Sequence, residues 1–117
     1  MKYLILLLFS ISILSCGKTN KLSGKTGTPA CVQQLIDSAM ANAKGALFTR
    51  IESYDYQNKR VYIYTPGCCD RYNEVKDENC VYLFSPSGGL TGKGDGKQPN
   101  FFSEAKFIAV VWEDKRP

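Results

Sequence analysis

Histidine is absent from the 117 residues of the chain. Catalytic groupings that need an imidazole, such as Ser–His–Asp and Cys–His arrangements, are therefore excluded, and so are metal sites built on histidine. A long apolar run is also missing, because the run at residues 3–13 is shorter than the roughly 20 apolar residues that a membrane-spanning helix needs. We expect no catalytic residues of these classes, no metal and no cofactor.

An excess of positive charge is missing from the part of the chain expected to fold. Four of the 15 basic residues precede residue 29, whereas all 11 acidic residues follow it, so residues 29–117 hold 11 basic and 11 acidic residues. Nucleic-acid binding needs lysine and arginine gathered on the folded surface. The net charge of +4 therefore gives no support for a nucleic-acid partner.

A signal peptide is predicted at residues 1–15. Lys2 precedes the apolar run at residues 3–13, and a small residue stands directly before Cys16, an order that is typical of an exported precursor. The end of this segment, Ile13-Leu14-Ser15-Cys16-Gly17, resembles the lipobox of bacterial lipoproteins. The alternative is an ordinary secretory signal with a chance cysteine after the cut.

The lipobox resemblance implies that the chain is cut before Cys16, which then carries a diacylglyceryl group and a further acyl chain. Each buried methylene adds about 0.8 kcal/mol of membrane affinity, and several chains together make the anchor durable. Gly17, in place of an aspartate, resembles the pattern that directs lipoproteins to an outer membrane. Because residues 16–28 contain no acidic run, we expect a domain in the bacterial cell envelope that faces the periplasm.

The remaining cysteines number four, an even count in an exported chain: Cys31, Cys68, Cys69 and Cys80. This predicts two disulfides. Adjacent side chains point to opposite faces of an extended backbone, so we expect Cys68 and Cys69 to bond to different partners. One would reach Cys31 and the other Cys80, and the sequence does not decide which. A zinc site of four thiolates is disfavoured, because its usual C-x2–4-C spacing is lacking.

The chain divides into the signal at 1–15, a lipidated flexible tether at 16–28 and one small α+β domain at 29–117. Helical spacing predicts a helix at 29–44, whose buried stripe is Val32, Leu35, Ile36, Ala39, Met40 and Ala43. Residues of alternating polarity predict strands at 49–56, 60–65, 79–84 and 106–112. The expected fold is α+β, with one N-terminal helix packed on a four-stranded antiparallel sheet in two layers.

Two sets of side chains alternate along the middle strands. The aliphatic set, expected to meet the helix, is Val61, Ile63, Val81 and Leu83; the aromatic set is Tyr62, Tyr64, Tyr82 and Phe84, extended by Tyr54, Tyr56 and Trp112. The aromatic face is either a binding platform or a second packed surface. Since a large bare apolar patch is unusual on a monomer, we favour a face covered by residues 85–104, whose apolar members are Pro86, Leu90, Phe101 and Phe102.

A glycine-rich segment follows the third predicted strand. It contains Gly88, Gly89, Thr91, Gly92, Lys93, Gly94, Asp95 and Gly96, and Cys68-Cys69-Asp70 stands upstream of it. Together these motifs resemble a family of small exported lipoproteins of unknown function that carry CCD followed by GGxTGKGDG, over residues 51–112. The resemblance implies no catalytic residues, since no activity is established for that family.

The glycine segment is the candidate ligand loop. Glycines at alternating positions let backbone N–H groups form a concavity that accepts an anion, to which Lys93 adds a charge and Asp95 an acceptor. The alternative is a purely structural loop of tight turns that binds no ligand. A P-loop is excluded because Ser87 replaces its first glycine, and an EF-hand is excluded because only Asp95 supplies a carboxylate.

Four acids crowd the segment between Cys69 and Cys80, namely Asp70, Glu74, Asp77 and Glu78. They form either a paired-carboxylate site or, as we favour, a solvated polar loop. Our first functional hypothesis is therefore a non-enzymatic binding or inhibitory module that meets an envelope protein or small ligand through the glycine loop. The alternative is a structural or accessory subunit of an envelope complex, and the third is an enzyme without histidine chemistry.

Overall fold

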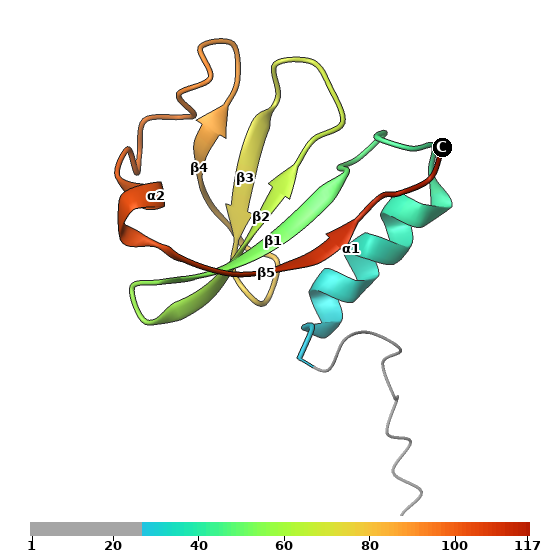
Figure 1. The fold of residues 1–117 in the computed structure, drawn as a ribbon, viewed down its shortest axis with the longest axis horizontal. Helices are drawn as coiled ribbons and strands as arrows, with labels where there is room; N and C mark the ends of the chain where they lie inside the picture. Colours follow the sequence, from blue (N-terminus) through green and yellow to red (C-terminus); the bar gives the residue numbers. More distant parts are fainter. Residues whose placement is uncertain (1–26) are drawn as a thin grey trace, which may run out of the picture.

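The computed structural model describes residues 27–117 (Figure 1). In this range, the helix α1 (Ala30–Ala41) packs on an antiparallel sheet of five strands, ordered β4-β3-β2-β1-β5. The strands are β1 (Arg50–Tyr56), β2 (Lys59–Thr65), β3 (Tyr72–Lys76), β4 (Tyr82–Gly88) and β5 (Lys106–Glu113), and a one-turn helix, α2 (Phe101–Glu104), precedes β5. The α+β class is confirmed. The predicted signal segment, Cys16 and the tether up to residue 26 lie outside the described residues.

The helix and the first hairpin form where the sequence predicts them, but the helix ends three residues early, at Ala41, and Met40 and Ala43 of the expected buried stripe are exposed. The Pro29 carbonyl accepts the first helical hydrogen bond, from the Gln33 amide at 3.0 Å, and Gly45 follows the helix at a φ of 76°. β1 and β2 are joined at Gln57 and Asn58, which both have positive φ. Such a two-residue turn matches the right-handed twist of paired strands.

The prediction of four strands is wrong by one, because β3 lies in the stretch that we expected to be a polar loop. Among its five residues only Val75 is fully buried, so the strand has little apolar signal. The strand predicted at 79–84 begins later, at Tyr82, since the preceding residues form a turn. The Asp77 carboxylate holds this turn by accepting hydrogen bonds from the Asn79 and Val81 amides at 2.8 and 3.0 Å.

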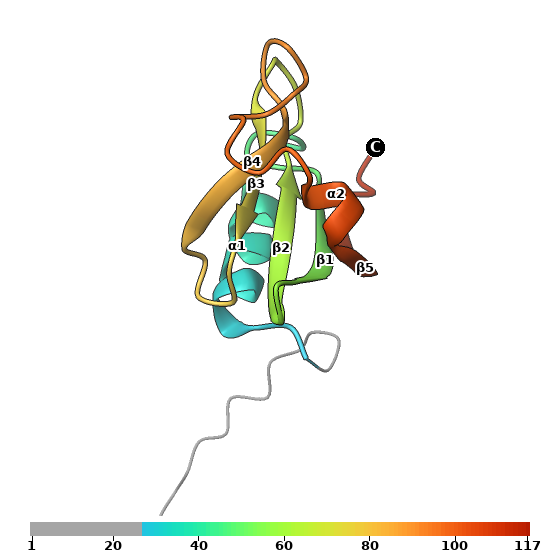
Figure 2. The ribbon, with the colours of Figure 1, turned by 90° about the vertical axis from the view of Figure 1, so that its left-hand side faces the viewer.

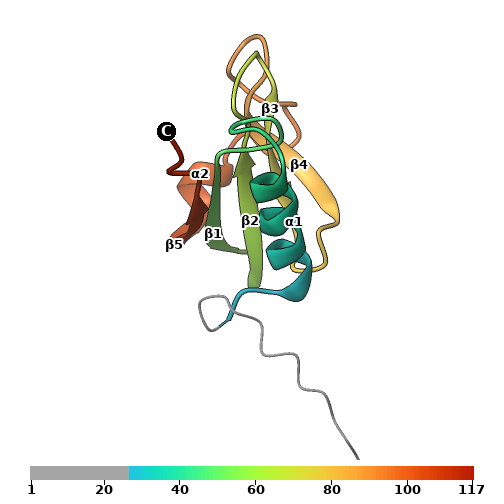
Figure 3. The same ribbon diagram turned by 90° about the vertical axis from the view of Figure 1, so that its right-hand side faces the viewer.

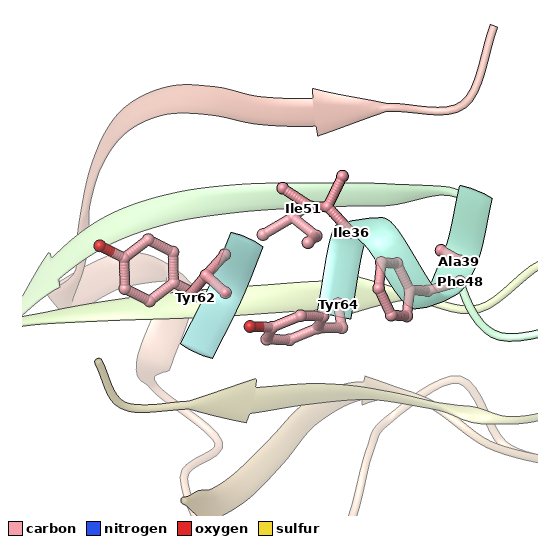
Figure 4. Close-up of a cluster of buried hydrophobic side chains, with 7 residues drawn as sticks. Ile36, Ala39, Phe48, Ile51, Tyr62 and Tyr64 are labelled. Carbon is pink, nitrogen blue, oxygen red and sulfur yellow. The ribbon is translucent and has the colours of Figure 1, made fainter. Parts of the chain in front are cut away.

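The two faces of β2 are reversed relative to our expectation, and the expected sets do not hold at residues 81–84, where Val81 and Leu83 are exposed. The helix covers the tyrosine face of β2, where Tyr62 and Tyr64 pack with the buried residues of α1 and with Phe48 and Ile51 (Figure 4). The aliphatic residues of β2 lie on the opposite face, in a cluster of Tyr56, Val61, Ile63, Val75, Phe84 and Phe101. The physical reason is that a tyrosine ring buries as well as an aliphatic chain, so alternation alone does not identify the helix-facing side.

The segment 85–104 covers one face of the sheet, as expected, but it covers the aliphatic one. Phe101 of α2 is fully buried and packs against Tyr56 and Phe84, with ring centroids 5.0 and 5.4 Å apart. Figure 3 shows the result, with α1 and α2 on opposite sides of the strands. Only Trp112 of the three residues added to the aromatic set lies with the tyrosine face; Tyr54 and Tyr56 belong to the other cluster.

The disulfides also differ from the predicted layout. Cys31, in the first turn of α1, is bonded to Cys80 in the β3–β4 turn, and Cys68 is bonded to Cys69 in the β2–β3 loop. The N-terminal end of α1 lies beside the β3–β4 turn, whereas the β2–β3 loop is at the other end of the sheet (Figures 1 and 2). Our prediction assumed extended backbone at the adjacent pair, but Cys69 has a φ of 74°.

The C-terminal tail is fixed to the last turn of α1 by Arg116. Its guanidinium donates to the carbonyl oxygens of Ala39 and Asn42 at 3.2 and 2.9 Å, and it pairs with the Asp114 carboxylate at 2.7 Å. Carbonyls at the end of a helix lack partners inside the helix. Arg116 therefore caps the C-terminal end of α1 and holds the C-terminal tail of the chain against this helix.

Both edges of the sheet are irregular. β4 contains Pro86, which has no backbone N–H, and the pairing of β5 with β1 shifts register twice, at Ile51/Glu52 and Ser53/Tyr54. Among residues 27–117, no helix is long and apolar enough to span a membrane.

Candidate functional site

The glycine loop, residues 88–96, leaves the end of β4 on the side of the sheet away from the start of α1 (Figures 1 and 2). All eight predicted loop residues therefore lie in this one loop. The β2–β3 loop, which carries Cys68 and Cys69, lies at the same end of the sheet. The sequence motifs CCD and GGxTGKGDG therefore lie at the same end of the sheet.

The Asp95 side chain organises the loop from within. One carboxylate oxygen accepts hydrogen bonds from the Tyr82 hydroxyl at 2.8 Å and the Ser85 amide at 2.9 Å, and the other accepts one from the Lys97 amide at 2.9 Å. Partial burial opposes ionisation of Asp95, but these hydrogen bonds outweigh it and lower the pKa of the carboxyl below its usual value. Because three hydrogen bonds from within the protein occupy this carboxylate, Asp95 stabilises the conformation of the loop.

The backbone amides that we expected to face an anion donate within the protein. The Gly92 and Gly94 amides donate to the carbonyls of Gly89 and Gly88 at 3.2 and 3.0 Å, and the Lys93 amide donates to the Thr91 hydroxyl at 3.3 Å. These amides are occupied by the loop's own turns. The geometry is that of a preformed loop rather than an open anion cradle.

Two glycines are required because the loop folds against the strand that leads into it. A Cβ on Gly88 would lie 2.6 Å from the Arg71 carbonyl oxygen, and one on Gly94 would collide with the Ser85 carbonyl oxygen. Both glycines have positive φ, 78° and 72°. Gly92, at the tip, also has positive φ, but a Cβ there would meet open space. The base of the loop is therefore tightly packed, while the space beside Gly92 at its tip is open.

The tip presents exposed side chains on this rigid base. Leu90 is 86% exposed, the highest value among the large hydrophobic residues of the described chain, and Thr91 and Lys93 beside it are exposed as well. An apolar side chain held in water by a preorganised loop gains free energy when a partner buries it. Leu90 was not among our predicted ligand residues, since it was expected to dock with the covering segment. Its place between two glycine turns is the signal that could have identified it.

Two hollows of the described surface lie outside the glycine loop. One of about 690 Å³ is at the opposite end of the sheet, between the β1–β2 turn and the β3–β4 turn, with Val61 and Phe84 in its lining. The other, of about 430 Å³, lies beside the β2–β3 loop and includes Phe48, Asp70 and Arg71. Neither is lined by residues 88–96. The exposed tip of the loop is therefore separate from both of these hollows.

The four acids between Cys69 and Cys80 are not brought together as a carboxylate pair. Asp70 lies in the β2–β3 loop, Glu74 pairs with Lys76 within β3 at 3.3 Å, and Asp77 holds the turn at the far end of that strand. Within residues 27–117, no group of three or more histidine, cysteine, aspartate or glutamate side chains is placed to hold a metal ion.

Comparison with known proteins identifies a family but no activity. A family model described as "Domain of unknown function (DUF6970)" matches residues 37–114, which is more than half of the chain. Neither a curated protein nor a solved structure matches the chain. The matched range contains all five strands, the Cys68–Cys69 pair and the glycine loop.

Proposed function

Since the chain belongs to the family DUF6970, whose function is unknown, we propose that it is a lipid-anchored envelope protein that acts as a non-enzymatic binding module through its glycine loop. One observation carries this proposal: the loop is held from within by Asp95 and exposes Leu90 at its tip. Ordering a flexible loop on binding costs free energy. A loop that is already ordered avoids that cost.

The composition of the tip indicates the kind of partner. Leu90 needs an apolar pocket, and Lys93, three residues along the same exposed turn, favours an acidic group beside that pocket. A protein surface can offer both features, and Leu90 at the tip would then act as a single anchoring side chain does in many interfaces. We therefore favour an envelope protein over a free small anion as the ligand.

The placement of the loop agrees with an anchor at Cys16. The described chain starts at Gly27, beside the start of α1, and the glycine loop lies at the opposite end of the sheet (Figure 2). An anchor that precedes α1 would hold that end of the domain nearest the membrane. The loop tip would then point away from the lipid, toward proteins of the periplasm.

A photo-crosslinking amino acid at position 90 tests the binding proposal. In cells that produce the full chain, we expect one crosslinked species of defined mass from position 90 and none from position 115, an exposed lysine outside the loop. Leu90→Asp should abolish co-purification of the same partner without changing the melting temperature of the protein, since residue 90 is already in water. Equal crosslinking from both positions would favour the accessory-subunit alternative, in which the loop only packs.

The anchor has its own test. Cys16→Ser should remove the lipid mass and leave either an uncleaved precursor or a soluble product. A variant that still enters the detergent phase as mature protein would contradict the lipoprotein assignment. Protease treatment of intact cells addresses the membrane side: a domain that faces the periplasm of an outer membrane should survive, and its removal would place it on the cell surface.

A further inference from the structure

The two disulfides have different physical consequences for the chain. Cys31 and Cys80 are 49 residues apart, so their bond removes a large loop from the conformational freedom of the unfolded state. Cys68 and Cys69 are neighbours, and their bond constrains almost nothing beyond one peptide unit. The Cys68–Cys69 bond therefore contributes little through chain entropy, and its presence calls for another explanation.

The surroundings of Cys68–Cys69 favour chemical reactivity. Both cysteines are exposed, whereas Cys31 and Cys80 are half-buried. Cys69 and Asp70 have φ values of 74° and 46°, in the left-handed region that residues with a side chain occupy only at a cost in free energy. Exposed disulfides in strained backbone are the ones that thiols reduce readily, because attack is unhindered and opening relieves the strain.

The β2–β3 loop also holds the base of the glycine loop. The Arg71 carbonyl, two residues after Cys69, accepts a hydrogen bond from the Gly89 amide at 3.0 Å. In the adjoining strand β3, the Asn73 side-chain amide donates to the Ser87 hydroxyl at 2.8 Å. A change of backbone conformation at Cys69 and Asp70 would therefore act on the hydrogen bond that holds Gly89, the residue before Leu90.

We propose that Cys68–Cys69 is a thiol–disulfide exchange site for a dithiol reductant and that its redox state controls the order of the glycine loop. A thiolate of the reductant attacks one sulfur, which forms a mixed disulfide and releases the other sulfur to take up a proton. The second thiol of the reductant then breaks the mixed disulfide. The chain gains two electrons and two protons, and the reductant leaves as its own disulfide. The effect on partner binding rests on the function proposed above, whereas the exchange chemistry does not.

Differential alkylation tests the chemistry. The full-length chain in detergent is treated with increasing dithiothreitol, its free thiols are alkylated, and the peptides are weighed. We expect Cys68 and Cys69 to be labelled at a concentration about tenfold or more below that needed for Cys31 and Cys80. Labelling of all four together, or of Cys31 and Cys80 first, would overturn the proposal.

Hydrogen exchange tests the control of the loop under the same conditions. Selective reduction should make the Gly89 amide exchange about tenfold faster, while the Asp95 amide, which donates to the Ser85 carbonyl at 2.8 Å, keeps its rate. The double variant Cys68→Ser/Cys69→Ser should show the fast Gly89 rate without reductant. Unchanged Gly89 exchange after selective reduction would overturn the control of the loop. Absence of crosslinking from position 90 in both redox states would instead contradict the proposed function and leave this chemistry standing.

Discussion

Removal of the Cys31–Cys80 bond should be the most damaging change among the cysteines. In the chain-entropy account, a bond that closes a loop of about 50 residues stabilises the folded state by about 4 kcal/mol at 25 °C. The sequence separation of Cys31 and Cys80 is 49. For a domain of this size, each kcal/mol corresponds to about 4–8 °C in melting temperature. The double variant Cys31→Ala/Cys80→Ala should therefore melt roughly 15–30 °C below the unmodified chain.

Urea denaturation of the full-length chain gives this number directly. Trp112 is the single tryptophan and packs edge-on against Phe48, with ring centroids 5.6 Å apart, so its fluorescence reports on the core beneath α1. The matched control is Cys68→Ser/Cys69→Ser, for which the same account predicts a loss of less than about 1 kcal/mol. Equal losses in the two double variants, or a loss below about 1 kcal/mol in the first, would refute the reasoning.

Four further substitutions probe the loop and the C-terminal tail. Gly92→Ala should lower the free energy of unfolding by about 1 kcal/mol, because of its left-handed backbone alone. Gly94→Ala should lower it by about 3 kcal/mol or more, because its Cβ also meets backbone atoms. Thermal unfolding compares the two variants. Asp95→Asn should speed hydrogen exchange of the loop amides at neutral pH, since a neutral amide replaces the anion that three donors share. Hydrogen bonds from Arg116 hold the pKa of Asp114 at about 2, so the stabilisation from this pair is present above about pH 4 and is lost as the pH falls toward 2. Arg116→Lys should reduce this acid sensitivity and lower the melting temperature at neutral pH, because an ammonium cannot replace the planar fork.

Local signals in the sequence predicted most of the secondary structure. The aliphatic stripe that includes Val32 and Ile36 identified α1, and alternation between Arg50 and Thr65 identified the first hairpin. β3 was missed because Tyr72–Lys76 carries charged residues and only one fully buried side chain, so its strand character comes from pairing with β2 and β4. Pairing of this kind depends on residues distant in the sequence, and a local pattern does not contain it.

The sequence predicted that residues 88–96 form one glycine-rich loop, and the structure places this loop at the same end of the sheet as the β2–β3 loop. That the loop binds a ligand stays a proposal. The inward role of Asp95 was not predicted, because it depends on the Tyr82 hydroxyl and the Ser85 amide across the base of the loop. The disulfide pairing was wrong because the sequence does not show which end of the sheet lies beside the start of α1.

The irregular edges of the sheet affect whether copies of the protein would associate at high local concentration. A protein confined to a surface meets copies of itself at high local concentration and in similar orientations, which are conditions under which free strand edges join into continuous sheets. On β4, the backbone N–H and C=O of Ser85 are already bonded to Asp95, at 2.9 and 2.8 Å, and the two register shifts of β5 disturb the spacing of its outer N–H and C=O groups. If the chain carries the lipid anchor proposed above, neighbouring copies in one leaflet would therefore remain separate molecules, each with its own loop tip available, instead of polymerising edge to edge.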